Sequence, residues 1–122
     1  MIGYVMLGSN DLERAKAFYD VVLAELGVKR TMGGDTMQGY GSDGDGPMLA
    51  VCRPYDGEAA TRGNGTMVAL TAQSREAVDK AHATALAHGA ADEGAPGLRG
   101  DTFYGAYFRD PDGNKLCVFK IG

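Results

Sequence analysis

The sequence is poor in the residues that build disulfide frameworks, thiolate metal sites and membrane spans. It holds two cysteines, two histidines, four prolines and no tryptophan among 122 residues. Cys52 and Cys117 lie outside any Cys-x-x-Cys pair, which argues against a disulfide framework and a thiolate zinc site. The apolar run around residues 21–24 is far too short to cross a bilayer. We therefore expect a cytoplasmic protein with two reduced thiols and no membrane partner.

The sequence also has no excess of positive charge. It carries 12 lysines and arginines against 16 acidic residues, for a net charge of −4. Without a basic stripe, a nucleic-acid partner is not expected. The amino terminus runs directly into a strand-like pattern and shows no signal-peptide architecture. This length and composition predict one globular domain.

Glycine and methionine are abundant, with 19 and six residues. The glycines stand singly between apolar stretches, as turns and helix ends require. Apolar spacing in the first half predicts a strand over 4–7, a helix over 11–26 with Asn10 as its N-cap, and strands over 28–32, 36–40 and 47–53. In the second half it predicts a strand over 66–71, a helix between Ser74 and Gly89, and strands over 102–108 and 115–121.

We interpret both halves as one β-α-β-β-β order and an internal repeat, although only two strands are assigned after the helix of the second half. The expected turns at Asp43–Gly46 and Asp110–Gly113 each precede a final strand, and Gly46 and Gly113 are 67 positions apart. Tyr40 and Tyr107 pair at the same spacing. A repeat of this size predicts two structural copies. We expect module one over 1–53, a connector over 54–65 and module two over 66–122.

Particular motifs within this repeat carry a family resemblance. They are Asn10–Ala15 leading into Phe18 and Tyr19, Leu23 with Leu26 and Gly27, Arg109–Asn114, and Gly63–Leu70 with Asp92–Arg99. With them the chain resembles the vicinal oxygen chelate superfamily of glyoxalase I, bleomycin-resistance proteins and extradiol dioxygenases, and in particular its bacterial glyoxalase-like branch. The resemblance implies an α+β fold in which two βαβββ modules form a cupped mixed sheet.

The resemblance also implies two metal ligands per module, from the first and last strands. At those positions this sequence has Tyr4, Ala50, Met67 and Cys117. Alanine has no donor atom and methionine suits copper(I), so we expect neither a bound metal nor another cofactor. His82 and His88 are six residues apart on one expected helix and point in different directions. We expect both to be solvated.

Strand alternation separates one face of branched aliphatic side chains from a second face of sulfur-containing, aromatic and alanine side chains, here called the softer face. This softer face, to which the repeat adds Tyr40 and Tyr107 and which has Arg109 at its rim, gives the candidate ligand-binding residues: Tyr4, Met6, Tyr40, Ala50, Cys52, Met67, Tyr107, Arg109, Cys117 and Phe119. Methionine and tyrosine suit a pocket for a planar or hydrophobic molecule. Arg62 and Arg99 lie in expected covering loops and could grip a carboxylate or phosphate, or be solvated.

Three functions stay open at this point. The favoured one is a glyoxalase-like protein with a degenerate metal site that binds a small apolar or aromatic molecule in the cup. The alternatives are a metal-independent lyase or isomerase, with Tyr4, Tyr40, Tyr107 or Glu93 handling protons, and a structural module whose cup is filled by side chains. Because an apolar face of this size needs a cover, we also expect a homodimer.

Overall fold

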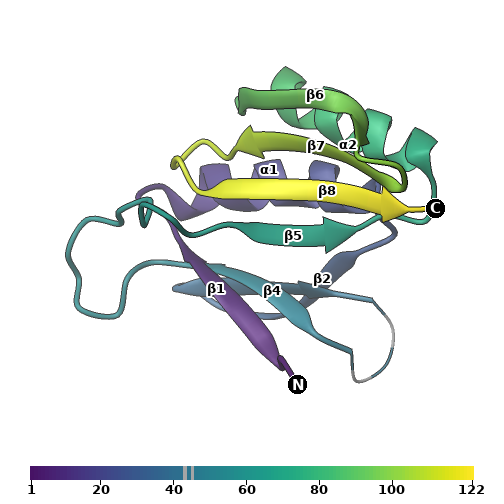
Figure 1. Cartoon of the computed structure of the whole chain (residues 1–122). Coiled ribbons are helices and arrows are strands. Elements are labelled where there is room, and N and C mark those ends of the chain that lie inside the picture. The colour runs from purple at the N-terminus through teal and green to yellow at the C-terminus, as the bar shows by residue number, and fades with distance from the viewer. Residues whose placement is uncertain (43, 45) are drawn as a thin grey trace.

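The computed structural model describes residues 1–42, 44 and 46–122, and its elements follow the repeat expected from the sequence (Figure 1). In chain order they are β1 (Tyr4–Gly8), α1 (Leu12–Ala24), β2 (Lys29–Gly33), β3 (Met37–Gly41), β4 (Met48–Cys52), β5 (Val68–Thr71), α2 (Arg75–Ala87), β6 (Ala91–Arg99), β7 (Phe103–Arg109) and β8 (Lys115–Ile121). The expected turn over 43–46 includes Asp43 and Asp45, which lie outside the described residues. No helix in the described part is long and apolar enough to cross a membrane.

The α+β fold of two βαβββ modules is confirmed, with the strands arranged as two separate sheets. Module one has the strand order β1-β4-β3-β2 and module two the order β5-β8-β7-β6. In each sheet the first and last strands of the module pair in parallel and the other neighbours are antiparallel. Leu49 pairs with Val5, and Leu116 pairs with Val68 in the same way. Leu49 and Leu116 are therefore equivalent positions.

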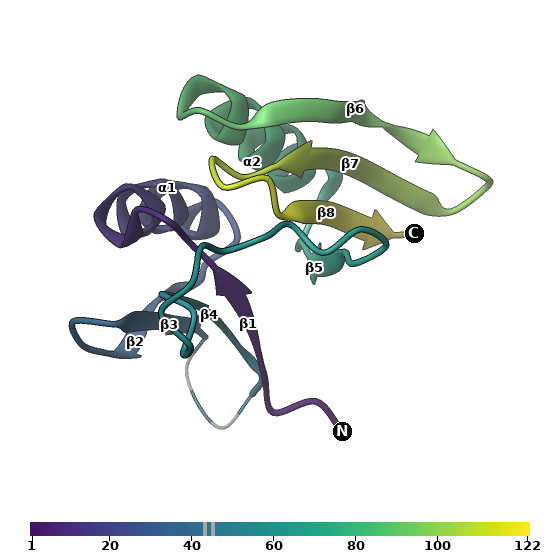
Figure 2. The same cartoon turned by 90° about the vertical axis from the view of Figure 1, so that its left-hand side faces the viewer.

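The two helices lie on the inner faces of the sheets, and α1 contacts α2 (Figure 2). Branched aliphatic and aromatic side chains from both sheets and both helices form the buried core, which includes Leu7, Phe18, Val22, Leu49, Val51, Val78, Phe108, Leu116 and Val118. The outer faces of the two sheets consequently point in different directions (Figure 2). This arrangement decides how much of the expected cup one chain can form.

Helix α1 begins one residue later than the sequence predicted. Asp11 is its N-cap, because its carboxylate accepts the Arg14 backbone N–H at 3.1 Å. Asn10 instead holds the connector: its side-chain oxygen accepts the Ala60 N–H at 2.7 Å, and its amide nitrogen donates to the Ala60 carbonyl at 3.3 Å. The predicted cap Ser74 is confirmed on α2, where its hydroxyl accepts the Ala77 N–H at 3.1 Å.

Strand β6 has no counterpart among the strands expected from the sequence, which assigned Arg99 to a covering loop. The strand contains Gly94, Pro96 and Gly97, and its register with β7 shifts twice. Proline and bulges are tolerated at a sheet edge, where β6 lies, and they erase the period-two pattern that marks a strand.

The placement of Tyr40 on the soft outer face was wrong. Tyr40 is buried on the inner face, where its hydroxyl donates to the Lys16 carbonyl at 3.2 Å and the Asp20 carboxylate at 3.0 Å. Burial and Asp20 both raise the Tyr40 pKa. Tyr40 pairs with Leu49, whereas Phe108 pairs with Leu116. The counterpart of Tyr40 is thus Phe108, because the hairpin of module one is one residue longer.

The turn that precedes β8 contains a buried carboxylate. Asp110 is 3% exposed, and its Oδ1 accepts the backbone N–H groups of Asp112 and Asn114, both at 2.9 Å. Its Oδ2 accepts the Tyr19 hydroxyl of α1 at 2.5 Å and the Asn114 side-chain amide at 3.0 Å. Burial and the charge of Asp110 raise the pKa of Tyr19 well above its usual value.

The same turn makes further bonds to the start of module one. Asp112 Oδ1 accepts the Asn10 backbone N–H at 2.9 Å and the Arg14 guanidinium at 3.1 Å. The Asn114 amide also donates to the Gly8 carbonyl at 2.9 Å. Tight-turn chemistry, the role expected from the sequence, is therefore only part of what these residues do. They also join module two to the β1–α1 junction of module one.

Candidate functional site

The candidate ligand-binding residues, Tyr40 excepted, fall into two groups on the outer faces of the two sheets. Met6 lies opposite Ala50 in the sheet of module one, and Tyr107 lies opposite Cys117 in that of module two. Tyr4 and Cys52 extend the first group, whereas Met67, Arg109 and Phe119 extend the second. Because the outer faces diverge, one chain presents two half-sites (Figure 2).

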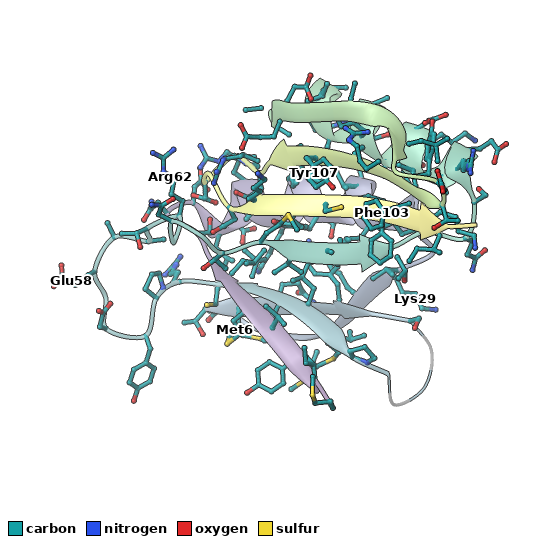
Figure 3. All side chains as sticks on the ribbon, in the orientation of Figure 1. Met6, Lys29, Glu58, Arg62, Phe103 and Tyr107 are labelled. Carbon is teal, nitrogen blue, oxygen red and sulfur yellow. The ribbon has the colours of Figure 1, made fainter. Side chains whose placement is uncertain are left out.

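The half-site of module one is a sulfur-lined groove of about 740 Å³. Its walls include Met6, Met37 and Cys52 from the sheet and Pro54 and Tyr55 from the connector. Figure 3 shows Met6 near the β1–β4 pair. Methionine side chains adapt to irregular partners, so this groove suits an apolar molecule of variable shape.

The half-site of module two has an aromatic end and a cationic end. Phe103 stacks on Phe119, with 5.0 Å between ring centroids and 10° between ring planes. Further along the same face, the Tyr107 ring lies 5.4 Å from the Arg99 guanidinium and 5.8 Å from the Lys115 ammonium. Figure 3 shows Phe103 and Tyr107 on the same side of the sheet.

Three of these side chains, Phe103, Arg99 and Lys115, are absent from the ligand-binding set proposed above, although Arg99 was expected in a covering loop. For two of them, strand alternation in the sequence already indicated the outer face. Phe103 shares the alternation of Tyr107, and Lys115 shares that of Cys117. Arg99 reaches the face from β6, the strand that was not recognised. Arg62, the other arginine expected near the cup, instead lies beside the β7–β8 turn, against Gly113.

Two of the groups proposed to handle protons, Glu93 and Tyr107, are engaged by neighbouring side chains. Glu93 accepts from Arg109 at 3.0 Å and lies 3.9 Å from Lys115, so its carboxylate is held in ion pairs. Burial raises the pKa values of both Tyr107 and Cys117, and the two side chains are hydrogen-bonded to each other. Both therefore stay protonated at neutral pH.

The residues at the expected metal positions do not fit a divalent metal. Tyr4 and Met67 are 62% and 45% exposed, while Ala50 and Cys117 are buried at 1% and 0%. Only the phenol and the thiol could become charged ligands, and burial raises the pKa of the Cys117 thiol. Within the described part of the chain, no group of three or more His, Cys, Asp or Glu side chains is placed to hold a metal ion.

The expectation that both helix histidines are solvated was wrong for His82. It is 5% exposed, its Nε2 lies 3.0 Å from the Asp92 carboxylate, and its ring packs on Phe108. It therefore ties α2 to β6. His88 is exposed at the end of α2, with Nδ1 2.8 Å from the Thr84 carbonyl.

A second groove, of about 590 Å³, runs between the two sheets. It is lined by Val5 and Leu49 from module one and by Met67, Val68 and Leu70 from module two. Strands β1 and β5 lie at the edges of their sheets next to this groove. Of these side chains Met67 is exposed, and it lies next to a sheet edge that has backbone groups available for pairing.

The two thiols should differ in reactivity. Cys117 is fully buried, whereas Cys52 is partly exposed in the groove of module one. Burial raises the pKa of both thiols, so labelling should be slow at neutral pH. With Ellman's reagent we expect one thiol per chain to react in the native protein and two after denaturation. Native labelling of Cys117, located by mass spectrometry of the peptides, would contradict this placement.

Two βαβββ modules, each with helix-covered inner and soft apolar outer sheet faces, define a glyoxalase-type fold. The chain belongs to the glyoxalase/bleomycin resistance protein/dioxygenase superfamily, whose family model matches residues 1–118. It is 39% identical to a glyoxalase/bleomycin resistance protein from Albidiferax ferrireducens T118, with a TM-score of 0.92 and coverage of 100% of this chain and 99% of that one. The comparison with curated proteins gave no match.

Two further solved structures share the fold at lower identity. A glyoxalase/bleomycin resistance protein/dioxygenase family enzyme from Burkholderia phytofirmans PsJN is 22% identical, with a TM-score of 0.79 and 98% of each chain covered. A lactoylglutathione lyase from Agrobacterium tumefaciens is 22% identical, with a TM-score of 0.71 and coverage of 98% of this chain and 92% of that one. At this level of identity these two bacterial structures support the fold alone.

Proposed function

We propose that this protein binds a small apolar or aromatic molecule without transforming it, in a cup built by two copies of the chain. The observation that carries the proposal is the division of the soft apolar residues into two half-sites that diverge within one chain. In a two-fold dimer, module one of one copy and module two of the other would complete the cup twice. The two free thiols fit the cytosolic location expected from the sequence.

The sheet edges support this assembly. Tyr4, Met6 and Met67 are all more than two-fifths exposed, and they lie on or next to β1 and β5. Pairing β1 of one copy with β5 of the other would satisfy edge backbone groups and cover these side chains together. It would also place the sulfur-lined groove beside the aromatic end of the partner's half-site.

The polar chemistry favours binding over catalysis. The metal positions lack a ligand set, Glu93 is paired with cations, and the hydrogen-bonded Tyr107 and Cys117 pair has raised pKa values. A general base needs a pKa near the working pH and a free path to substrate. The thioether, phenyl and phenol groups that remain are those of an apolar binding pocket.

The test is a fluorescence titration with the neutral aromatic probe N-phenyl-1-naphthylamine, combined with light scattering. We expect a dimer at micromolar concentration, with saturable enhancement of probe fluorescence at one site per chain. Met6→Glu should weaken probe binding at least about tenfold, because it places a carboxylate in the groove. The matched control is Leu86→Glu, which charges an exposed apolar position on α2. Absence of saturable binding, or equal effects of the two variants, would contradict the proposal.

A further inference from the structure

Backbone carbonyl groups on the outer face of module two hold the guanidinium of Arg99 in place. Its Nη1 donates to the carbonyls of Gly97 at 2.8 Å and Gly105 at 3.1 Å, and its Nη2 donates to the Ala95 carbonyl at 2.8 Å. A methyl group on Gly97 would approach the guanidinium to 3.2 Å. These contacts fix a side chain that would otherwise be mobile, so the position of its charge is set before any ligand arrives.

The guanidinium of Arg99 still has N–H donors and an unneutralised positive charge available for a ligand. A guanidinium has five N–H groups, and the three carbonyls use three of them. Among the described residues, no carboxylate forms a salt bridge with Arg99. The neighbouring cations Arg109 and Lys115 share the single carboxylate of Glu93. The cluster of three cations and one carboxylate therefore has an excess of positive charge around Tyr107.

The chemistry changes along the same face. Phe103, Tyr107 and Arg109 occupy alternate positions of β7, and Phe119 and Lys115 lie opposite this row on β8. Phe103 and Phe119 form the stacked apolar end, whereas Lys115 flanks the Tyr107 ring at the cationic end. Arg99 pairs with Phe103 in the register of β6 and β7, and its guanidinium extends from there past Gly105 to the Tyr107 ring. The face thus runs from hydrocarbon to positive charge within one strand length, on the order of 20 Å.

We propose that the cationic end is an anion subsite, and that the ligand is an aromatic or aliphatic acid whose carboxylate, sulfonate or phosphate binds at Arg99 and Lys115. Its apolar body would lie toward Phe103 and Phe119. This inference rests on the proposed function, because it specifies the class of molecule that enters the same cup. Arginine with free N–H groups recognises such oxyanions through charge-assisted hydrogen bonds.

Two matched probes test the subsite. 1-Anilinonaphthalene-8-sulfonate carries an anionic group on the ring system of N-phenyl-1-naphthylamine, which is neutral. We expect the wild-type protein to bind the sulfonate more tightly than the neutral probe. Arg99→Gln and Lys115→Gln should each weaken sulfonate binding about tenfold and change neutral-probe binding less than twofold. Added salt should weaken the sulfonate alone.

The control is Arg75→Gln, because Arg75 lies 5.1 Å from the Tyr104 ring on the other side of β7. It should leave the binding of both probes unchanged. Lys115→Gln serves as an independent variant, since Arg99→Gln also removes hydrogen bonds within β6 and β7. If neither probe binds, the proposed function fails. If both bind equally and neither Arg99→Gln nor Lys115→Gln discriminates between them, the proposed function stands and the anion subsite is wrong.

Discussion

Replacing Asp110 with alanine should lower the free energy of unfolding by about 3–4 kcal/mol, the largest single loss of stability expected for this chain. The carboxylate accepts four hydrogen bonds in a buried setting, from Tyr19, Asp112 and the backbone and side chain of Asn114. Alanine would leave these donors unpaired. The expected loss of thermal stability is on the order of 10–15 °C, measured by circular dichroism with urea unfolding for the free energy.

Two companion variants separate the junction from general effects of charge. Tyr19→Phe removes one donor and should cost about 1–2 kcal/mol, because the acceptor keeps its other bonds. Asp101→Ala removes an exposed carboxylate between β6 and β7 and should cost less than about 0.5 kcal/mol. A loss at Asp110 no larger than at Asp101 would show that the turn does not join the modules.

The sequence predicts the turn at this junction but not its contacts with module one. The motif at residues 110–114 has an evident local role, since proline and glycine favour a tight turn. Its partners Tyr19 and Arg14 are 91 and 98 positions away in the sequence. Nothing local specifies contacts between modules, so the turn was predictable and the junction was not.

The strand faces were largely predictable because side chains alternate strictly along a strand. Leu49, Val51 and Val118 lie inward as expected, and Met6 and Cys117 lie on the outer faces. The predicted face of Tyr40 was wrong because a fixed repeat spacing was applied across two hairpins of different length. A shift of one residue along a strand moves a side chain to the opposite face of the sheet. The one extra residue in the hairpin of module one therefore moved Tyr40 from the predicted outer face to the inner face.

The division of the cup into two half-sites could not be predicted from the sequence. Periodicity shows which face of each element is apolar, and it does not show how one module packs on the other. That geometry follows from the contact of α1 with α2 and from the turn at residues 110–114. The need for a cover could be inferred from the apolar composition, whereas the divergence of the outer faces could not.

Met67→Glu should weaken the proposed dimer about a hundredfold or more. Met67 is 45% exposed, lies just before β5 and lines the groove between the two sheets. In the dimer this side chain would be covered by the partner's β1, and covering a carboxylate in an apolar seam costs several kcal/mol. Since each 1.4 kcal/mol is a factor of ten, the dissociation constant should rise by at least two decades, measured by analytical ultracentrifugation.

The matched control, Glu76→Gln, changes charge at an exposed position in the first turn of α2 and should leave the dimer intact. The Met67 variant should still fold, because the carboxylate remains hydrated at the exposed edge of a single chain. Loss of the dimer should therefore come with an unchanged circular dichroism spectrum and with weaker binding of the neutral aromatic probe. A wild-type monomer at micromolar concentration, or an equally stable dimer with glutamate at position 67, would overturn the assembly and with it the shared cup.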